Sequence, residues 1–326
     1  MNNQILIGAD PELMLFDAKG KAISALGKIG GTKAQPRLLK DFGRGYAIQE
    51  DNVNVEYNIP ACKTNAMFCS ANQLMLDYIN GYVGPMGLTA KAVASTEFED
   101  DELQHPLAHV FGCEPDYNAW ELEVNVFPEV KNKRLRSAGG HIHIGIPNMS
   151  NERKIMLVRC LDVILGSTLN ALEPPNERAK LYGRPGAMRF KPYGLEYRVP
   201  SNYWLSSPTI TTLVGGIIRD FCHVFQAEAV ETSVKLCMDV SEEAVQKAFD
   251  NREFIPNGTE ALQYLGYDSL LYVNNKPEPV KAKKTRMVKV ADDPVEYVEM
   301  PQAPAWGARP MRFEDFFPEA VEQRAR

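Results

Sequence analysis

The chain has 326 residues, of which 44% are hydrophobic and 24% are charged, and its formal net charge is −6. These values are ordinary for a soluble globular protein with a substantial core. The acidic balance disfavours broad nucleic-acid binding, which depends on basic surface. No apolar run approaches the roughly 20 residues of a membrane-spanning helix, and the first ten residues lack the pattern of a secretory signal. The six cysteines show no CxxC spacing, which favours a reducing, cytoplasmic compartment.

Alternation of polar and apolar residues predicts strands, and apolar residues at helical spacing predict helices. Ser150 or Asn151 can cap the helix that starts at residue 152, and Pro174 and Pro175 follow its end. In chain order, the predicted elements are strands over 4–17 (bent at Pro11) and 45–60, a helix over 65–84, strands over 119–128 and 139–147, a helix over 152–172, a strand over 194–201, and helices over 208–231, 241–251 and 259–266.

This order lacks the regular strand–helix alternation of a doubly wound parallel sheet. It predicts an α+β fold around a largely antiparallel sheet. After about residue 273 the chain becomes rich in proline and charge, which is typical of an extended or partly disordered arm. We therefore expect one domain over residues 1–272 and a C-terminal arm over residues 273–326. The run KAKKTR in this arm suits a solvated segment, or else a contact with nucleic acid or a partner.

Four of the predicted segments carry ionisable or polar side chains two residues apart, and such residues share one face of a strand. The residues between them are mostly apolar and are expected to face the core. The polar sets are Asp10 and Glu12 (provided that Pro11 leaves the strand extended), Asn52, Asn54 and Glu56, His141 and His143, and Glu196 and Arg198.

A single strand with alternating charge is usually one solvated face of a sheet. Taken together, these four strands have an unusual composition, because carboxylates, an imidazole pair and an arginine occupy their centres and lysine does not. Carboxylate oxygens with one or two imidazoles suit divalent cations such as Mg²⁺ or Mn²⁺. The sequence therefore predicts a metal-lined face of the sheet.

The stretch over residues 177–204 is rich in arginine and lysine, separated by glycine and proline. Guanidinium groups bind phosphate oxygens in a bidentate manner, so this stretch is either a phosphate clamp or a solvated basic loop. A clamp beside a metal site indicates a nucleoside triphosphate. The chain has no P-loop and no GxGxxG after a strand, so such a site has to be built from the sheet face.

In order along the chain, the motifs GADPEL, NVEYNIP, FGCEPDYNAW, AGGHIHIG and YGRPGAMRFKPYGLEYRVPSNYWL together resemble the phage phiEco32-like COOH-NH2 ligases. The resemblance covers roughly residues 5–235 and includes the glutamine synthetase and glutamate-cysteine ligase fold. It implies a curved, mostly antiparallel sheet with helices on its convex side. It also implies an ATP-dependent, amide-forming ligase that uses Mg²⁺ or Mn²⁺ and passes through an acyl phosphate.

The resemblance also implies roles for individual residues. Either His141 or His143 contacts the metal, with His141 favoured, and the other faces phosphate. The base that deprotonates the amine is left open between a carboxylate and His143. The implied metal ligands are Asp10, Glu12, Glu56, His141 and Glu196, the implied nucleotide-binding residues are Arg184, Arg189, Lys191, Arg198 and His143, and the implied catalytic residues are Arg184, Arg198 and His143.

The expected partners are a small-molecule or peptide carboxylate and an amine, with no membrane and with nucleic acid disfavoured. The wider fold often assembles, so a homo-oligomer is an expectation as well. A phage-encoded chain of this kind would work in the cytoplasm of its host cell.

Two alternatives compete with a ligase. The first is a zinc-dependent metallohydrolase that uses the HxH strand, with His105, His109 and Cys113 as a second set of soft ligands at helical spacing. The second is a non-catalytic nucleotide-binding protein that keeps a ligase-like fold.

Overall fold

The computed structural model describes residues 4–109, 116–126, 131–227 and 231–275. The predicted C-terminal arm, with its KAKKTR run, lies almost entirely outside these ranges, as does Cys113. The five cysteines in the described ranges, Cys62, Cys69, Cys160, Cys222 and Cys237, are free thiols.

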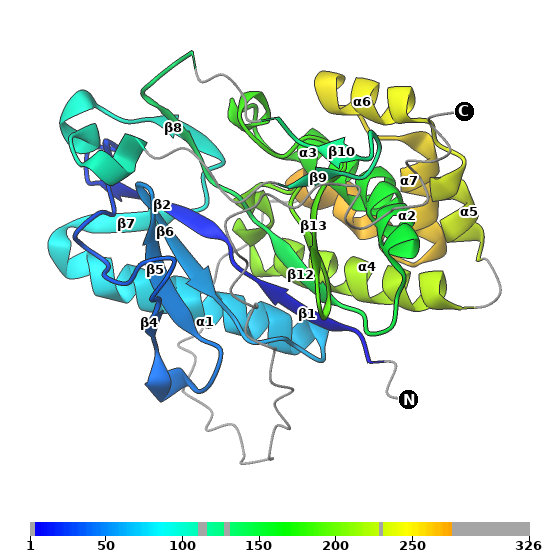
Figure 1. The fold of residues 1–326 in the computed structure, drawn as a ribbon, viewed down its shortest axis with the longest axis horizontal. Coiled ribbons are helices and arrows are strands. Elements are labelled where there is room, and N and C mark those ends of the chain that lie inside the picture. The colour runs from blue at the N-terminus through cyan, green and yellow to red at the C-terminus, as the bar shows by residue number, and fades with distance from the viewer. Residues whose placement is uncertain (1–3, 110–115, 127–130, 228–230, 276–326) are drawn as a thin grey trace.

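A six-stranded antiparallel sheet, which we call the central sheet, forms the middle of the molecule (Figure 1). Its apolar and polar residues alternate as the sequence predicts: Ile142 and Ile144 are fully buried in the main core, while the histidines beside them face the other way. The strands in spatial order are β1 (Leu6–Ala9), β12 (Ile142–Gly145), β14 (Gly194–Tyr197), β13 (Ala187–Lys191), β9 (Tyr117–Asn118) and β10 (Glu123–Val124).

A second antiparallel sheet, the N-terminal sheet, is formed by the first third of the chain. A separate two-stranded ladder pairs β8 (Ser95–Glu97) with β11 (Leu135–Ser137). The N-terminal sheet has the order β3 (Ala22–Ile23), β2 (Glu12–Asp17), β6 (Asn54–Asn58), β5 (Ala47–Asp51) and β4 (Arg37–Leu38), with β7 (Leu88–Lys91) also paired to β2.

The segment over 4–17 is two strands, so the prediction of one bent strand is wrong. The chain leaves the central sheet after Ala9 and enters the N-terminal sheet at Glu12, because Pro11 has no N–H to continue a ladder. Backbone hydrogen bonds still cross this break. The Glu12 N–H donates to the carbonyl of Gly139, and the Tyr57 N–H donates to the carbonyl of Pro11. The two sheets therefore form one continuous, bent surface.

The segment over 45–60 is a hairpin, so the prediction of a single strand is wrong here too. Strands β5 and β6 pair antiparallel, with Asp51 opposite Asn54. The turn is made by Asn52, whose φ of 55° lies in the left-handed region, a conformation that asparagine tolerates better than most residues. The turn places Asn52 outside the row that it was predicted to share with Asn54 and Glu56.

The predicted strand over 119–128 is also interrupted. Its described part holds a turn after β9, where Leu122 has a φ of 60°, and then the two-residue strand β10. Strand β13, in contrast, was not predicted, because its residues were read as part of a basic loop.

The predicted helices are all present, but the one predicted over 208–231 ends at Gln226, and α5 was not predicted. Ser150 caps the helix over 151–172 by accepting a hydrogen bond from the Arg153 N–H. The helices are α1 (Asn65–Val83), α2 (Asn151–Leu161), a π-helical turn (Asp162–Gly166), α3 (Ser167–Leu172), α4 (Pro208–Gln226), α5 (Thr232–Met238), α6 (Glu242–Asn251) and α7 (Pro256–Tyr264). Short 3₁₀ turns lie at Lys40–Phe42, Gly84–Met86, Asp100–Leu103, Pro106–His109, Arg178–Lys180, Asn202–Leu205 and Asp268–Asn275.

The helices cover the apolar side of the strands, and Figure 1 shows α1 and α4 crossing behind them. The helix Asn151–Leu172 is long and apolar enough to span a membrane, but 72% of its most apolar window is buried inside the protein, as in the core helix of a globular fold. The predicted α+β fold around an antiparallel sheet is confirmed.

The π-helical turn begins with Asp162, a fully buried carboxylate in this apolar layer. Burial raises its pKa to about 7, against the opposing effect of hydrogen bonds from Trp120, Tyr197 and Gly186. Between the ordinary carboxyl pKa and 7, the folded protein therefore holds a proton that the unfolded chain has lost.

This raised pKa predicts a pH dependence of stability. The contribution of Asp162 is fully present below the unfolded pKa and is lost as the pH rises to 7. The free energy of unfolding of the wild type, minus that of Asp162→Asn, should fall across this range in urea titrations at pH 4 to 7. A difference that stays level or rises with pH would contradict the prediction.

Candidate functional site

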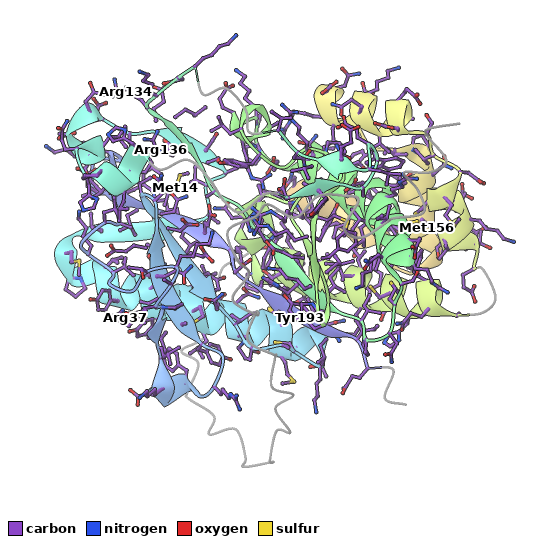
Figure 2. The ribbon with its side chains drawn as sticks, in the orientation of Figure 1. Met14, Arg37, Arg134, Arg136, Met156 and Tyr193 are labelled. Atoms are coloured by element: carbon purple, nitrogen blue, oxygen red, sulfur yellow. The ribbon has the colours of Figure 1, made fainter. Side chains whose placement is uncertain are left out.

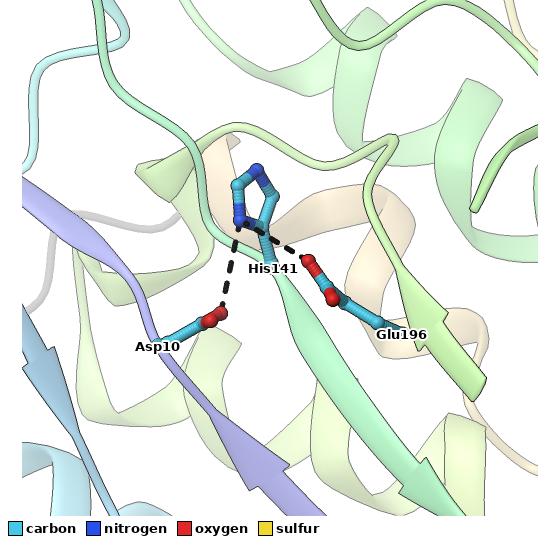
Figure 3. Close-up of side chains that lie close together, drawn as sticks. All are labelled: Asp10, His141 and Glu196. Carbon is cyan, nitrogen blue, oxygen red and sulfur yellow. Dashed lines mark ion pairs between the residues drawn. The ribbon is translucent and has the colours of Figure 1, made fainter. Parts of the chain in front are cut away.

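The first acidic group of the site consists of Asp10, His141 and Glu196 (Figure 3). They come from three adjacent strand segments: Asp10 follows β1, His141 precedes β12, and Glu196 is in the centre of β14. The Nδ1 atom of His141 lies 3.7 Å from Oδ1 of Asp10 and 3.9 Å from Oε1 of Glu196. Candidate ligand atoms of all three residues lie within 4.8 Å of one another.

The second acidic group consists of Glu12, Asp51 and Glu56 in the N-terminal sheet, again with ligand atoms within 4.8 Å of one another. Glu12 and Glu56 face each other directly across the β2–β6 ladder. The side-chain amide of Asn54 donates to Oε2 of Glu12 at 3.1 Å, and the Gly139 N–H donates to the same oxygen at 2.9 Å.

Asp10 connects the two groups. It lies in the first group, yet its carboxylate is also the strongest charged contributor to the raised pKa of Glu56, after burial. The break in the chain at Pro11 is responsible, because it sends Asp10 toward one sheet and Glu12 toward the other while keeping them two residues apart.

The polar face is buried rather than solvated. Glu196 is 1% exposed and Arg198 is 4% exposed, and Glu12, Glu56 and His141 are buried as well, whereas Asp10 and Asp51 are half-buried. A solvated face, the default reading of alternating charge on a strand, is therefore excluded for these positions. Buried ionic groups are costly unless they are paired or bind a cation.

Three cationic side chains surround Glu196. Arg198 donates from Nη1 to Oε1, and Arg189 donates to the same oxygen at 3.3 Å. Lys191 contacts the other oxygen, Oε2, at 3.0 Å. Arg189 and Lys191 lie on β13 directly beside β14, so they belong to a strand and not to a solvated basic loop. Arg198 is held in addition by Asp116, whose Oδ2 lies 3.1 Å from its Nε.

The two acidic groups differ in charge balance. Burial, followed by repulsion from Asp51, raises the pKa of Glu12 to about 7, and burial with neighbouring carboxylates raises the pKa of Glu56 well above its usual value. Burial also acts to raise the pKa of Glu196, but Arg198 and the other cations outweigh it and hold that pKa well below its usual value. The Glu12 group has excess negative charge, whereas Glu196 is compensated by the protein.

His141 is oriented with a lone pair toward the first group. Arg198 Nη1 lies 3.3 Å from Nδ1 of His141, and because a guanidinium only donates, Nδ1 has to accept. Burial, with the Arg198 charge, lowers the pKa of His141 well below its usual value. The ring fits because residue 139 is glycine: a Cβ there would lie 2.4 Å from Nε2 of His141.

His143 has different partners, although it lies on the same side of the strand. Its Nε2 lies 3.1 Å from Oδ2 of Asp10, and its Nδ1 is hydrogen-bonded to the hydroxyl of Tyr193. Tyr193, labelled in Figure 2, belongs to the β13–β14 hairpin turn. Burial lowers the pKa of His143, but the Asp10 carboxylate outweighs this effect and raises it.

The structure does not bring every predicted residue into this cluster. Arg184 is exposed in the turn before β13, and Asn52 lies in the β5–β6 turn. Asp51 and Asp116 were missed as site residues. The Asp-Asn pair at 51–52 is a turn signal. A single strand over 45–60 places Asp51 on the same, core-facing side as Val53 and Val55, whereas a hairpin with its turn at residue 52 does not.

The residues fit a divalent cation. Oδ1 of Asp10 and Oδ1 of Asn54 are buried and, within the described part of the chain, accept no hydrogen bond. Such oxygens next to clustered carboxylates are available as ligands. Oxygen donors with at most one imidazole suit Mg²⁺ or Mn²⁺ better than Zn²⁺, which takes mainly nitrogen and sulfur in protein sites.

The zinc alternative gains no support from the described residues. Neither acidic group there contains a cysteine or a second histidine. The predicted helical row of His105 and His109 is only a 3₁₀ turn over Pro106–His109, and His105 Nδ1 accepts a hydrogen bond from the Leu107 N–H.

Arg178 supports the backbone at the C-terminal end of the Glu196 strand. It is 5% exposed and donates to the carbonyls of Arg198 and Val199. Gly183 makes room for it: a Cβ at Gly183 would lie 1.7 Å from Nη1 of Arg178 and 2.8 Å from the Val199 carbonyl oxygen.

Gly183→Ala should therefore destabilise the protein by about 2–4 kcal/mol, combining a left-handed backbone with a steric clash. Gly20→Ala is the matched control, because Gly20 has a similar φ of +83° and no atom within 4 Å of its added Cβ. It should cost about 1–2 kcal/mol, the backbone contribution alone. Equal losses of unfolding free energy in urea would show that Arg178 does not need the space.

A comparison with known protein families matches the part of the chain that contains His141, Glu196 and Arg198. Residues 133–253 match the family model described as phage phiEco32-like COOH.NH2 ligase-type 2. This segment contains both histidines and the β13–β14 hairpin, whereas Asp10 and the N-terminal sheet lie outside it. No curated protein matches the chain.

Among solved structures, the chain is similar to GmaS in complex with ADP, with a TM-score of 0.38 and 11% identity over 82% of this chain and 65% of GmaS. It is similar to GmaS without ligand at a TM-score of 0.36 and 12% identity, over 86% of this chain and 72% of the other. The chain thus spans less than two thirds of the length of the first of these structures. Over residues 133–253, the match confirms the resemblance of this chain to the phage phiEco32-like COOH-NH2 ligases.

Proposed function

We propose that this protein is an ATP-dependent carboxylate–amine ligase that forms an amide bond with the help of Mg²⁺ or Mn²⁺. The observation that carries the proposal is the arrangement of two largely buried acidic groups joined at Asp10, with three cationic side chains in contact with Glu196 of the first group. Acidic groups of this kind hold divalent cations, and the adjacent guanidinium and ammonium groups suit phosphate oxygens. The family match to residues 133–253 supports the same class of reaction.

In the proposed reaction, an oxygen of the substrate carboxylate attacks the γ-phosphorus of ATP, and the bond to ADP breaks. The amine nitrogen then attacks the acyl carbon, phosphate leaves, and the amine loses a proton to a carboxylate or to His143. Bound cations would neutralise charge on the phosphate oxygens. Because little covalent chemistry falls to the protein, positioning and electrostatic stabilisation supply most of the catalysis.

The chain's own residues divide this work. We propose that Asp10, Glu196 and Nδ1 of His141 hold one cation and that Glu12, Asp51 and Glu56 hold another, with Oδ1 of Asn54 as an additional oxygen donor. The choice of His141 over His143 rests on its partners, since His143 is already held between Asp10 and Tyr193.

Arg189, Lys191 and Arg198 are proposed to bind the transferred phosphoryl group. All three now contact Glu196, so a cation bound by Glu196 would replace part of their charge and release them toward phosphate. Arg184 is exposed, and we assign it no role in this step.

The test is a substrate screen. The purified protein is incubated with Mg²⁺ and ATP, pooled acids and pooled amines, and both phosphate release and the mass of any condensed product are measured. Phosphate release that requires both an acid and an amine, with a product of the condensed mass, is expected. Nucleotide binding without turnover with any pair would favour a non-catalytic binding protein instead.

A further inference from the structure

Asp162 is a carboxylate that no part of the proposed reaction uses. It lies on the opposite side of the central sheet from the acidic groups, in the π-helical turn, and is fully buried. Burying an ionisable group in an apolar layer costs free energy, so the presence of Asp162 there needs a reason other than stability.

Its two oxygens accept hydrogen bonds from three separate segments. Oδ1 accepts from the Tyr197 hydroxyl at 2.7 Å. Oδ2 accepts from Nε1 of Trp120 at 2.7 Å and from the Gly186 N–H at 2.6 Å. All three donors meet one carboxylate, which fixes their mutual positions to within hydrogen-bonding tolerance.

Each of these three segments carries charged residues of the candidate site. Tyr197 lies between Glu196 and Arg198 on β14, and strand alternation sends its ring to the Asp162 side. Gly186 immediately precedes β13, which bears the cations that contact Glu196. Trp120 follows β9, close to Asp116, the second partner of Arg198.

The local backbone is shaped for these contacts. Gly186 has a φ of +82°, and a Cβ there would lie 2.3 Å from Oδ1 of Asn118. Gly166, at the other end of the π-helical turn, allows the Tyr197 ring to approach, because a Cβ there would lie 2.5 Å from its hydroxyl oxygen. A π-helical turn inside an α-helix is often found at a functional position.

We propose that Asp162 is a positioning residue, which sets β13, β14 and the 116–120 segment against one helix and so fixes Arg189, Glu196 and Arg198 relative to one another. The geometric part of this inference stands on the structure alone, and its consequence for turnover rests on the proposed function. Supporting groups behind a site commonly change activity by about 10- to 100-fold.

The test uses Asp162→Asn in the full chain, with Asp268→Asn, an exposed position, as the matched control. Asparagine has nearly the shape of aspartate but presents an N–H₂ to one of the three donors. Amide hydrogen exchange in β13, β14 and residues 116–120 should become at least about tenfold faster. Exchange in α1, which packs against α4 and β7 and not against the three segments bonded to Asp162, should not change.

Unchanged exchange in β13 and β14 would overturn the proposal, and so would an equal acceleration in α1, which reports general destabilisation. Tyr197→Phe serves as a second variant, since it removes one hydrogen bond without adding a polar group, and its effect should be smaller and centred on β14.

Turnover provides the second readout. With any substrate pair found in the screen, Asp162→Asn should lower kcat by about 10- to 100-fold with little change in KM. A kcat equal to that of the Asp268→Asn control would overturn the functional part of the inference. If the wild type itself shows no turnover, the proposed function fails, while hydrogen exchange still decides whether Asp162 positions the strands.

Discussion

Glu56→Gln should stabilise the metal-free protein and at the same time remove its stabilisation by Mn²⁺. Glu56 is buried opposite Glu12, next to Asp51 and within reach of the Asp10 charge. Burial and these like charges raise its pKa well above the usual value. Neutral glutamine keeps the shape and removes the repulsion, so the free energy of unfolding should rise by about 1–2 kcal/mol without metal, the range of other stabilising substitutions.

The same substitution removes a ligand of the proposed cation site. A ligand that binds only the folded state stabilises it by about 2.7 kcal/mol at 100 times its Kd, and the variant should lose this gain. Urea unfolding with and without Mn²⁺ measures both effects. Glu260→Gln removes the same charge from an exposed position. It should change neither the free energy of unfolding without metal nor the stabilisation by Mn²⁺. A Glu56→Gln variant that is destabilised without metal, or that gains as much from Mn²⁺ as the wild type, would contradict this account.

Ligase turnover should disappear in Glu56→Gln as well, falling by at least about 10³-fold, because charge stabilisation at the transferring phosphoryl group is the main catalytic contribution in such a site. The substrate pair from the screen gives the assay, and Glu260→Gln should keep wild-type rates.

Glu196→Gln should have the opposite effect on stability. Glu196 is 1% exposed and neutralises Arg198, Arg189 and Lys191. Removing one partner of a buried ion pair leaves an uncompensated charge and costs about 3–5 kcal/mol. We expect a loss of this size in urea unfolding, together with a loss of turnover comparable to that of Glu56→Gln.

The contrast between the two variants is the sharper measurement. Both replace a buried glutamate of the same polar face by glutamine, so a general intolerance of the face would destabilise both. Only the difference in local charge, excess negative around Glu56 and excess positive around Glu196, predicts opposite signs. Destabilisation of similar size in both variants would show that the surrounding charges do not govern these positions.

Residues of one strand were correctly grouped by their sequence alone. His141 with His143, and Glu196 with Arg198, lie on one face because side chains alternate along any strand, and no tertiary contact is needed to know it. The same holds for the helices: apolar spacing, the Ser150 cap and the prolines predicted their positions, since these signals act within a few residues. The antiparallel α+β class followed from the order of such local elements.

Tertiary structure decided which strands meet and where the chain turns. Asp10 and Glu12 were predicted to lie together, but the break at Pro11 divides them between two sheets, and this division creates two acidic groups instead of one. Asp51 enters the site only through the β5–β6 hairpin. A shift of one residue in the alternation of a strand reverses the side to which every following side chain points. A turn that is missed in the sequence therefore assigns a site residue to the core.

The charge balance of each group also depended on the fold. Arg189 and Lys191 read as loop cations in sequence, and it is the pairing of β13 with β14 that places them on Glu196. The supporting role of Asp162 could not be predicted from the sequence, because its three hydrogen-bond donors lie 24 to 42 residues away along the chain. Sequence determines which side chains share a face, because that depends on local backbone geometry. Only the packed fold determines which charges lie within a few ångströms, because electrostatic partners are set by contacts between distant segments.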